Sequence, residues 1–170
     1  APPAGDMPLP EFRAAGHQVI DWIADYLAEI DQFPVLARVA PGEIGEKLPL
    51  ESPEDGTPIE TILGDIDRVV IPGITHWNHP GFFAYFGITG SGPGILGEAV
   101  AAALNVNAML WRTSPAATEL EERALDWLRQ MLGLPNIFTG HIQDTASSST
   151  LVAIAAAREA TRLQIRDRGM

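Results

Sequence analysis

The sequence has 170 residues, 46% of them hydrophobic, so it is long and apolar enough to bury a core. Its formal net charge of −11 argues against a partner that presents a phosphate backbone, so we expect no nucleic-acid partner. It has no cysteine, no apolar run near the roughly 20 residues that span a bilayer and no signal-peptide pattern at its start. These absences exclude disulfides and thiolate metal sites, argue against a membrane span and favour a cytoplasmic protein.

The first predicted element is an amphipathic helix from Glu11 to Ile30. Its apolar residues recur at intervals of three, four and seven, which is the spacing of one helical stripe. The stripe consists of Phe12, Val19, Trp22, Ile23, Tyr26, Leu27 and Ile30. Because it is rich in large side chains and lies near a chain end, it can cover its own domain or a second subunit.

A second helix is predicted after residues 31–56, which are rich in proline and glycine and read as an irregular surface segment. Thr57 and Glu60 have the spacing of a capping box, and Pro58 stands at the first helical position. The Pro-Gly pair at 72–73 ends the helix. Its expected buried face comprises Ile59, Ile62, Leu63, Ile66, Val69 and Val70.

Residues 73–94 form the most aromatic part of the chain. The rings are those of Trp77, Phe82, Phe83, Tyr85 and Phe86. Flanking glycines and prolines predict irregular backbone, and rings displayed on irregular backbone can form the wall of a binding pocket. The alternative is that the rings fill the core, which we expect of Phe82 and Phe83. Tyr85 keeps a hydroxyl that can meet a polar group of a substrate.

His76 and His79 raise the question of a metal site. Their spacing can place two imidazoles on one helical face, but the Pro-Gly pair that follows opposes a helix, and no third ligand is near in sequence. We therefore expect no metal.

Two further helices are predicted in the middle of the chain. Residues 95–108 are rich in alanine and apolar on most sides, which indicates a buried helix. The next helix begins with Ser114 as N-cap and Pro115 at the first position, and Gly133 and Pro135 stop it.

Three carboxylates, Glu119, Glu121 and Glu122, lie in the early turns of that helix. They invite an acid–base hypothesis. We interpret them instead as a solvated helix face, because nothing apolar surrounds them that would favour a bound proton.

The stretch from Gly140 to Arg158 carries the strongest chemical signal. Five hydroxyl side chains run into an alanine-rich block of good helix formers, which predicts a loop that enters a buried helix: Thr145, Ser147, Ser148, Ser149 and Thr150. The free N–H groups of a helix start attract anions, and short hydroxylated residues let an anion approach closely. We therefore predict an anion site, most readily for a phosphate. The alternative is ordinary capping by one serine, which does not require five hydroxyls.

Four of these stretches resemble one family. The helix FRAAGHQVIDWIADYL, the run HWNHPGFFAYF, the motif SPAATELE with its DWL helix, and TASSST are similar to the group II pyridoxal-phosphate-dependent decarboxylases, which include the aromatic L-amino acid, histidine and glutamate decarboxylases. The resemblance covers about Phe12 to Arg158. It implies a mainly α chain, with an N-terminal helical and dimerisation segment over 1–110 that includes the aromatic loop. Residues 111–170 would then begin the large α/β cofactor domain of a fold-type I enzyme, truncated at its C-terminal end.

The resemblance also implies site residues. The phosphate of pyridoxal 5'-phosphate would be held by Thr145, Ala146, Ser147 and Ser148. The substrate side chain would meet Trp77, Tyr85, Phe86, Ile88, Asn107 and Met109. Ile88 stands where aromatic-type members often carry threonine, which leaves the choice of substrate open. Asn107 and Met109 would approach the active site of a partner subunit and are candidates for substrate contact, although for Met109 we expect core packing first.

The only lysine of the sequence, Lys47, lies in a Pro/Gly-rich loop that offers neither a desolvating apolar neighbourhood nor a motif suited to a Schiff base. Enzymes of this family hold their cofactor as a Schiff base with a lysine, and that lysine, the ring-stacking histidine and the aspartate of the pyridinium nitrogen belong to later sequence. We therefore expect no catalytic residue in this chain. It would be a fragment, a split subunit or the front part of a longer polypeptide, inactive alone.

The implied reaction is the release of CO2 from an amino acid, aromatic by preference, to give an amine. The expected partners are the amino acid, the remainder of the polypeptide or a second chain, and a second copy in a homodimer. Three alternatives stay open: an aldehyde synthase of the same family, a non-catalytic split subunit, and a helical interaction module in which the serine run only caps a helix. A serine hydrolase is disfavoured, because no G-x-S-x-G motif surrounds any serine.

Overall fold

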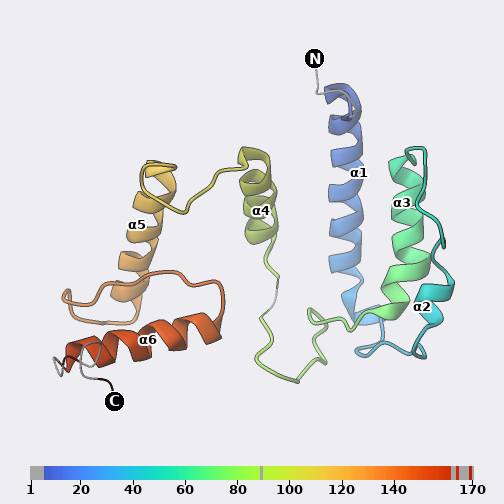
Figure 1. Ribbon diagram of the computed structural model, residues 1–170. Helices are drawn as coiled ribbons and strands as arrows, with labels where there is room; N and C mark the ends of the chain where they lie inside the picture. Colours follow the sequence, from blue (N-terminus) through green and yellow to red (C-terminus); the bar gives the residue numbers. More distant parts are fainter. Residues whose placement is uncertain (1–5, 89, 162–163, 165–168, 170) are drawn as a thin grey trace. The chain divides into compact units, whose positions relative to one another are not determined.

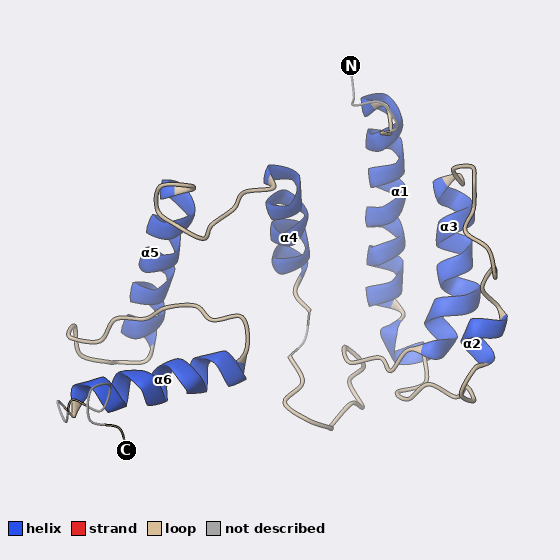
Figure 2. Ribbon diagram, in the orientation of Figure 1, coloured by secondary structure: helices blue, strands red, loops and turns tan. Residues whose placement is uncertain are grey.

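The computed structural model describes residues 6–88, 90–161, 164 and 169 of the chain. Every regular element within these ranges is a helix, as Figure 2 shows, which confirms the prediction of a mainly helical chain. The chain divides into two compact units, Ala1–Ile95 and Leu96–Met170. The predicted domain division at residue 110 stays a prediction. None of the described helices has the length and apolarity that crossing a bilayer requires.

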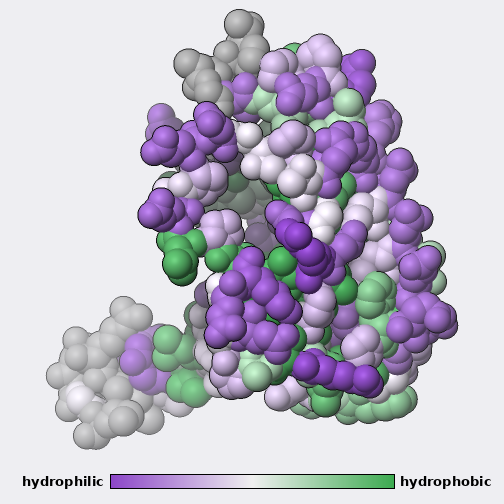
Figure 3. All heavy atoms as spheres, turned by 90° about the vertical axis from the view of Figure 1, so that its right-hand side faces the viewer, coloured by the Kyte–Doolittle hydropathy of each residue, from purple (hydrophilic) through white to green (hydrophobic). Residues whose placement is uncertain are grey.

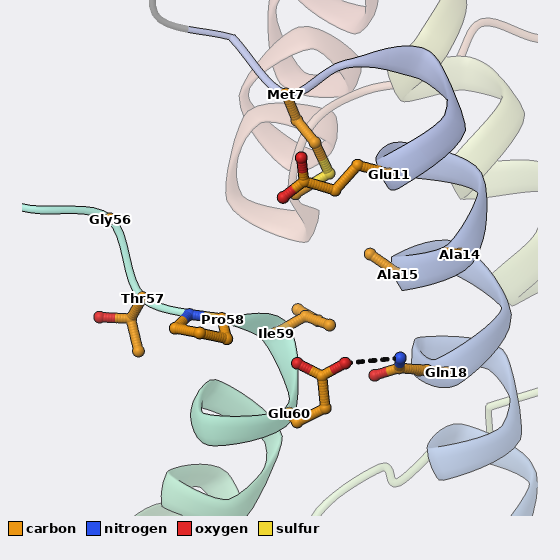
Figure 4. A pocket seen from close by; sticks show the side chains of 10 residues that line it. All are labelled: Met7, Glu11, Ala14, Ala15, Gln18, Gly56, Thr57, Pro58, Ile59 and Glu60. Atoms are coloured by element: carbon orange, nitrogen blue, oxygen red, sulfur yellow. Dashed lines mark hydrogen bonds between the residues drawn. The ribbon is translucent and has the colours of Figure 1, made fainter.

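The first unit is organised around α1 (Leu9–Ala28), which confirms the predicted amphipathic helix. This helix lies beside α3 (Ile59–Asp65) in Figure 1. A groove runs between the first half of α1 and the start of α3, and across it Gln18 Nε2 donates a hydrogen bond of 2.8 Å to Glu60 Oε1 (Figure 4). The hydrogen bond from Gln18 lowers the pKa of Glu60.

The capping box predicted at the start of α3 is wrong. Pro58 is the N-cap, and no side chain accepts a hydrogen bond there, so Thr57 does not cap the helix. The carboxylate of Glu60 instead accepts from Gln18 on another helix. After α3 the chain continues as η2 (Ile66–Val70), a π-helical turn, and η3 (Ile71–Gly73), so the helical path still ends at the predicted Pro-Gly pair.

The segment between α1 and α3 is largely irregular, as predicted. Two short helices interrupt it, η1 (Ile30–Gln32) and α2 (Glu43–Glu46). Lys47 follows α2, and its Nζ atom forms an ion pair of 3.0 Å with Glu43 Oε1. The hydrogen bond from Lys47 lowers the pKa of Glu43.

A buried histidine joins α1 to the aromatic segment. The side chain of His76 is 1% exposed, and its Nδ1 atom lies 2.9 Å from the Tyr26 hydroxyl. The imidazole also stacks on Phe33, with ring centroids 4.8 Å apart, and its backbone N–H donates to the Val35 carbonyl over 3.0 Å. Among the residues that the structure describes, none meets its Nε2 atom in hydrogen-bond geometry. If this imidazole were protonated, its positive charge would therefore be buried with little stabilisation from water or from an acceptor at Nε2.

Burial lowers the pKa of His76, and the nearby His79 lowers it further, while the backbone of Ile71 acts in the opposite direction. The imidazole is thus held neutral in the folded chain.

The second unit contains α5 (Pro115–Met131), which begins as predicted. Ser114 is its N-cap, and the serine Oγ atom accepts from the Ala117 N–H over 3.2 Å. The helix also ends as predicted, because Gly133 takes a left-handed φ of 66°, a conformation that glycine adopts without a steric penalty.

Two helices that the sequence predicts to be buried, α4 (Gly92–Leu104) and α6 (Ala146–Ala160), are exposed in this chain. Leu96 on α4 is 54% exposed and Leu151 on α6 is 69% exposed. Only three of the described residues are buried hydrophobic side chains: Ala15, Val69 and Ile71. Figure 3 shows hydrophobic residues at the surface, among hydrophilic ones, on one face of the molecule. The prediction of burial is wrong here because no described residue covers these apolar faces.

Replacing the Ser114 N-cap tests the local stability of α5. Ser114→Ala should lower the free energy of unfolding by about 1 kcal/mol, because the Ala117 N–H loses its acceptor. Ser114→Asp should keep most of the stability. Urea unfolding followed by circular dichroism is the measurement, with Ser52→Ala, at an exposed serine outside any helix, as the matched control. Equal effects of the two alanine variants would contradict this role of Ser114.

The buried histidine predicts an acid-sensitive stability. Above about pH 6.5 the folded and unfolded chains both hold His76 neutral, and the residue adds no pH dependence. Below that value the unfolded chain takes up the proton first, because burial lowers the folded pKa, so the free energy of unfolding should fall between pH 6.5 and 5. His76→Gln should make this decline in the free energy of unfolding shallower. His17→Gln, at an exposed position, should leave the decline unchanged. Urea unfolding at several pH values measures the effect, and an equally steep decline in His76→Gln would refute it.

Candidate functional site

The candidate anion site is the start of α6. Thr145 is its N-cap, with an extended backbone (φ −146°, ψ 163°), and its Oγ1 atom accepts from the Ser148 N–H over 3.2 Å. The Thr145 carbonyl accepts from the Ser149 N–H over 3.0 Å. The run therefore does cap the helix, through Thr145 and not through one of the serines, and the anion site stays a prediction.

The cap leaves two backbone amides free. Within the described part of the chain, the N–H groups of Ala146 and Ser147, the first two residues of α6, have no protein acceptor. Both residues are exposed. Free N–H groups at a helix start carry the positive end of the helix dipole, so these two present a partial positive charge to an anion.

Asp144 lies immediately before this helix start. A hydrogen bond from the Ser148 hydroxyl lowers the pKa of its carboxyl. Burial opposes this effect less strongly, and backbone hydrogen bonds at Thr145 and Asp144 lower the pKa by smaller amounts. The helix start therefore already stabilises one negative charge. An anion that binds to the free amides would lie close to a second anion, because Asp144 is ionised at neutral pH.

The other hydroxyls of this stretch have different surroundings. Thr150 Oγ1 donates back to the Ala146 carbonyl over 2.8 Å, so it serves the helix rather than a ligand. Ser148 Oγ lies 3.2 Å from Thr145 Oγ1, inside the cap. Ser147 is exposed, and its hydroxyl has no partner among the described residues. Ser149 is also exposed and its hydroxyl has no partner among the described residues, so Ser147 is the one member of the predicted phosphate set, Thr145 to Ser148, whose hydroxyl is free to reach an anion within the described part of the chain.

The aromatic segment brings some of the predicted wall residues together. Trp77 stacks on Tyr85 with ring centroids 5.6 Å apart and planes at 11°, and it also contacts Phe82 at 4.8 Å. Tyr85 takes a left-handed φ of 57°, which is uncommon for a residue with a large side chain. The stacked pair is an exposed apolar surface with a phenol at one end.

Other predicted wall residues stand apart from this stack. Phe86 and Ile88 are almost fully exposed, and neither belongs to a ring contact. Phe83 is 93% exposed, so the prediction that it fills the core is wrong, while Phe82 is half-buried beneath Trp77.

Asn107 and Met109 lie in the second unit, after α4. Asn107 Oδ1 accepts from the Met109 N–H over 2.9 Å, which forms a tight turn. The Met109 side chain is exposed, so core packing, the first expectation for this residue, is wrong in this chain. The geometry leaves both side chains accessible.

Two carboxylates of α5 have specific partners. Glu119 Oε1 accepts from Trp111 Nε1 over 3.0 Å, and Glu121 Oε1 accepts from the Ile142 N–H over 2.8 Å. Glu119 and Glu122 are exposed, as the interpretation of a solvated face predicts, whereas Glu121 is only partly exposed and is engaged by the segment at Ile142, so the interpretation is wrong for Glu121. Sequence reasoning missed the Glu121 contact because its partner is 21 residues away along the chain.

Neither the lysine nor the histidines form a reactive site. Lys47 is paired with Glu43 at the surface of the first unit. His76 is bound to Tyr26, whereas His79 Nδ1 accepts from the Gly81 N–H over 2.8 Å, so the two imidazoles serve separate partners. Within the described ranges, no group of three histidines or carboxylates could hold a metal ion.

Comparison with known proteins identifies the family of the chain. The model of the pyridoxal-dependent decarboxylase conserved domain matches residues 41–170. The chain is 44% identical over 159 residues to tryptophan decarboxylase 2 of Oryza sativa subsp. japonica, covering 90% of this chain and 32% of that protein. It is 46% identical over 157 residues to phenylacetaldehyde synthase of a Rosa hybrid cultivar, covering 91% and 31%.

Solved structures give the same result. The chain superposes on Catharanthus roseus tryptophan decarboxylase, solved with L-tryptophan, with a TM-score of 0.83 and 42% identity, over 91% of this chain and 35% of that one. Oryza sativa TDC, solved with PLP, gives a TM-score of 0.85 and 35% identity over 99% and 37%. The chain thus spans about a third of the length of these relatives. From the domain match and these likenesses together, the chain belongs to the pyridoxal-dependent decarboxylase family.

Proposed function

We propose that this chain supplies the phosphate-binding helix start and an aromatic substrate wall to a pyridoxal 5'-phosphate-dependent decarboxylase of aromatic L-amino acids. The observation that carries the proposal is the pair of free amides at Ala146 and Ser147, which fit a phosphate group at the positive end of α6. Membership of the family supports the identity of the cofactor.

The division of work follows from these groups. Pyridoxal phosphate, when bound, supplies an electron sink for the bond between Cα and the carboxylate. The amides of Ala146 and Ser147 hold its phosphate, and the Ser147 hydroxyl adds a donor. The Thr145 hydroxyl accepts from the Ser148 N–H and also lies beside the Ser148 hydroxyl. The capping interaction therefore does not use the amides of Ala146 and Ser147, which stay open. The chain's contribution is therefore orientation and electrostatics.

The substrate side chain would lie against the aromatic segment. Trp77 and Tyr85 offer a flat apolar surface to an aromatic ring, and the Tyr85 hydroxyl can meet a polar group. Phe86 and Ile88 follow on the same segment and stay proposed contacts. The names of relatives, which include tryptophan and tyrosine decarboxylases, support an aromatic substrate.

Three further parts of the proposal rest on the family alone. Asn107 and Met109 would contact substrate across a homodimer. The Schiff-base lysine would come from polypeptide outside these residues, whether the same chain or a second one, since Lys47 is engaged with Glu43. A cytoplasmic location stays a prediction from the sequence.

A second candidate reaction has its own support. Relatives include phenylacetaldehyde synthase of Rosa and the 4-hydroxyphenylacetaldehyde synthase of Rhodiola rosea, whose solved structure matches with a TM-score of 0.72 and 41% identity. Products distinguish the two reactions: an amine indicates simple decarboxylation, and an aldehyde formed with consumption of oxygen indicates oxidative deamination.

Ala146→Pro tests the phosphate site directly. Proline at the first helical position removes one N–H without breaking the helix, and the extended Thr145 before it suits a following proline. Losing one amide bonded to a charged group should weaken pyridoxal phosphate binding at least roughly tenfold. Ala146→Ser, which keeps the N–H, is the matched control. Equilibrium dialysis of the protein that carries this segment is the measurement. Unchanged binding in the proline variant would support the helical interaction module instead.

Asp144→Asn tests the electrostatics of the same place. Removing one negative charge beside the phosphate should tighten pyridoxal phosphate binding by roughly a few-fold at low salt, and the gain should shrink as ionic strength rises. The gain should be constant between pH 7 and 8, because hydrogen bonding lowers the Asp144 pKa and keeps the carboxylate ionised, and because the second ionisation of a phosphate monoester, with a pKa of about 6, is nearly complete there. Asp55→Asn, an exposed aspartate of the first unit, is the control. Weaker binding in Asp144→Asn would show that this carboxylate organises the loop rather than opposing the phosphate.

A further inference from the structure

The segment that leads into the helix start of α6 is tied to α5 by one carboxylate. Glu121 Oε1 lies 2.8 Å from His141 Nδ1 and 2.8 Å from the Ile142 backbone nitrogen. The glutamate side chain is 28% exposed, so solvent screens these contacts only in part. Both contacts are made by the same carboxylate oxygen. They hold the side chain of His141 and the backbone of Ile142.

A second contact on the same face of α5 fixes the residue before. Leu125 is four residues after Glu121, so both side chains lie on one face of the helix. A Cβ atom built at Gly140 would meet the Leu125 side chain at 3.2 Å, which shows how closely the backbone of Gly140 approaches Leu125. Three consecutive residues, Gly140 to Ile142, are therefore held by two neighbouring turns of α5.

This tether is close to the proposed phosphate site in sequence. Only Gln143 and Asp144 separate Ile142 from the Thr145 cap. No hydrogen bond or ion pair joins the side chains of these two residues to α5 within the described part of the chain. The position of the cap relative to α5 therefore depends on the tether at Gly140 to Ile142.

We infer that Glu121 is a positioning residue for the phosphate loop: by pairing with the His141 imidazole and accepting from the Ile142 N–H, it sets where the amides of Ala146 and Ser147 stand. This inference rests on the proposed phosphate site. The proposed role of Glu121 involves no contact with the phosphate. Its Oε1 atom contacts both His141 and Ile142, and the backbone of Gln143 and Asp144 connects these residues to the helix start.

The test compares two ligands that differ only in the phosphate. Binding of pyridoxal 5'-phosphate and of pyridoxal is measured by equilibrium dialysis with the cofactor-free form of the protein that carries this segment. Glu121→Leu removes the acceptor, and Glu121→Gln keeps the shape and a neutral acceptor. The affinity ratio of pyridoxal phosphate to pyridoxal should fall roughly tenfold in Glu121→Leu and less in Glu121→Gln, with pyridoxal affinity unchanged. Glu122→Gln, at the exposed neighbour, should keep the wild-type ratio.

The outcomes separate this inference from the function on which it rests. If Ala146→Pro lowers the ratio but both Glu121 variants keep it, the phosphate site stands and the positioning role is refuted. If the Glu121 variants lose affinity for both ligands in parallel, Glu121 has only a general structural role, and the inference is wrong. If the wild type binds both ligands equally well, the phosphate site fails and the inference fails with it. Thermal unfolding of each variant confirms that the isosteric Glu121→Gln is folded.

Discussion

The proposed phosphate site depends on how the start of α6 is capped. At α6 the threonine cap satisfies the amide of Ser148 and leaves the amides of Ala146 and Ser147 without a protein acceptor. Two aligned N–H groups at the positive end of a helix of 15 residues form a place where an anion is favoured over water. The family to which the chain belongs uses a phosphorylated cofactor. The negative phosphate of that cofactor and the partial positive charge of the open amides are complementary.

Each of the two proposed binding segments is held by a contact with a distant part of its own unit. In the second unit, α5 holds the segment before the helix start through Glu121 and Leu125. In the first unit, His76 is buried against Tyr26 of α1, while the next residue, Trp77, carries the exposed stack with Tyr85. In both units a buried or half-buried polar side chain anchors an irregular segment whose next few residues face outward. Irregular backbone thereby gains the fixed geometry that binding requires.

Sequence reasoning succeeded where the causes were local. The Ser114 cap and the left-handed Gly133 at the two ends of α5 follow from residue type and position alone, and both are present. The amphipathic α1 likewise follows from its own spacing. The family motifs also located the hydroxyl stretch, although the capping residue is Thr145 rather than a serine.

It failed where a distant partner decided the outcome. Glu60 leaves its expected capping box for Gln18, 42 residues away, and Glu121 leaves the solvated face for the segment at Ile142. The burial of α4 was predicted wrongly for a related reason. An apolar helix indicates that some surface should cover it but not which one, and no described residue of this chain covers α4. Local patterns cannot name a partner that lies far along the chain.

The most direct test is a crystal structure of the protein loaded with pyridoxal 5'-phosphate. The account predicts phosphate oxygens within about 3.2 Å of the backbone nitrogens of Ala146 and Ser147. A phosphate bound elsewhere, with these two amides facing solvent, would contradict it.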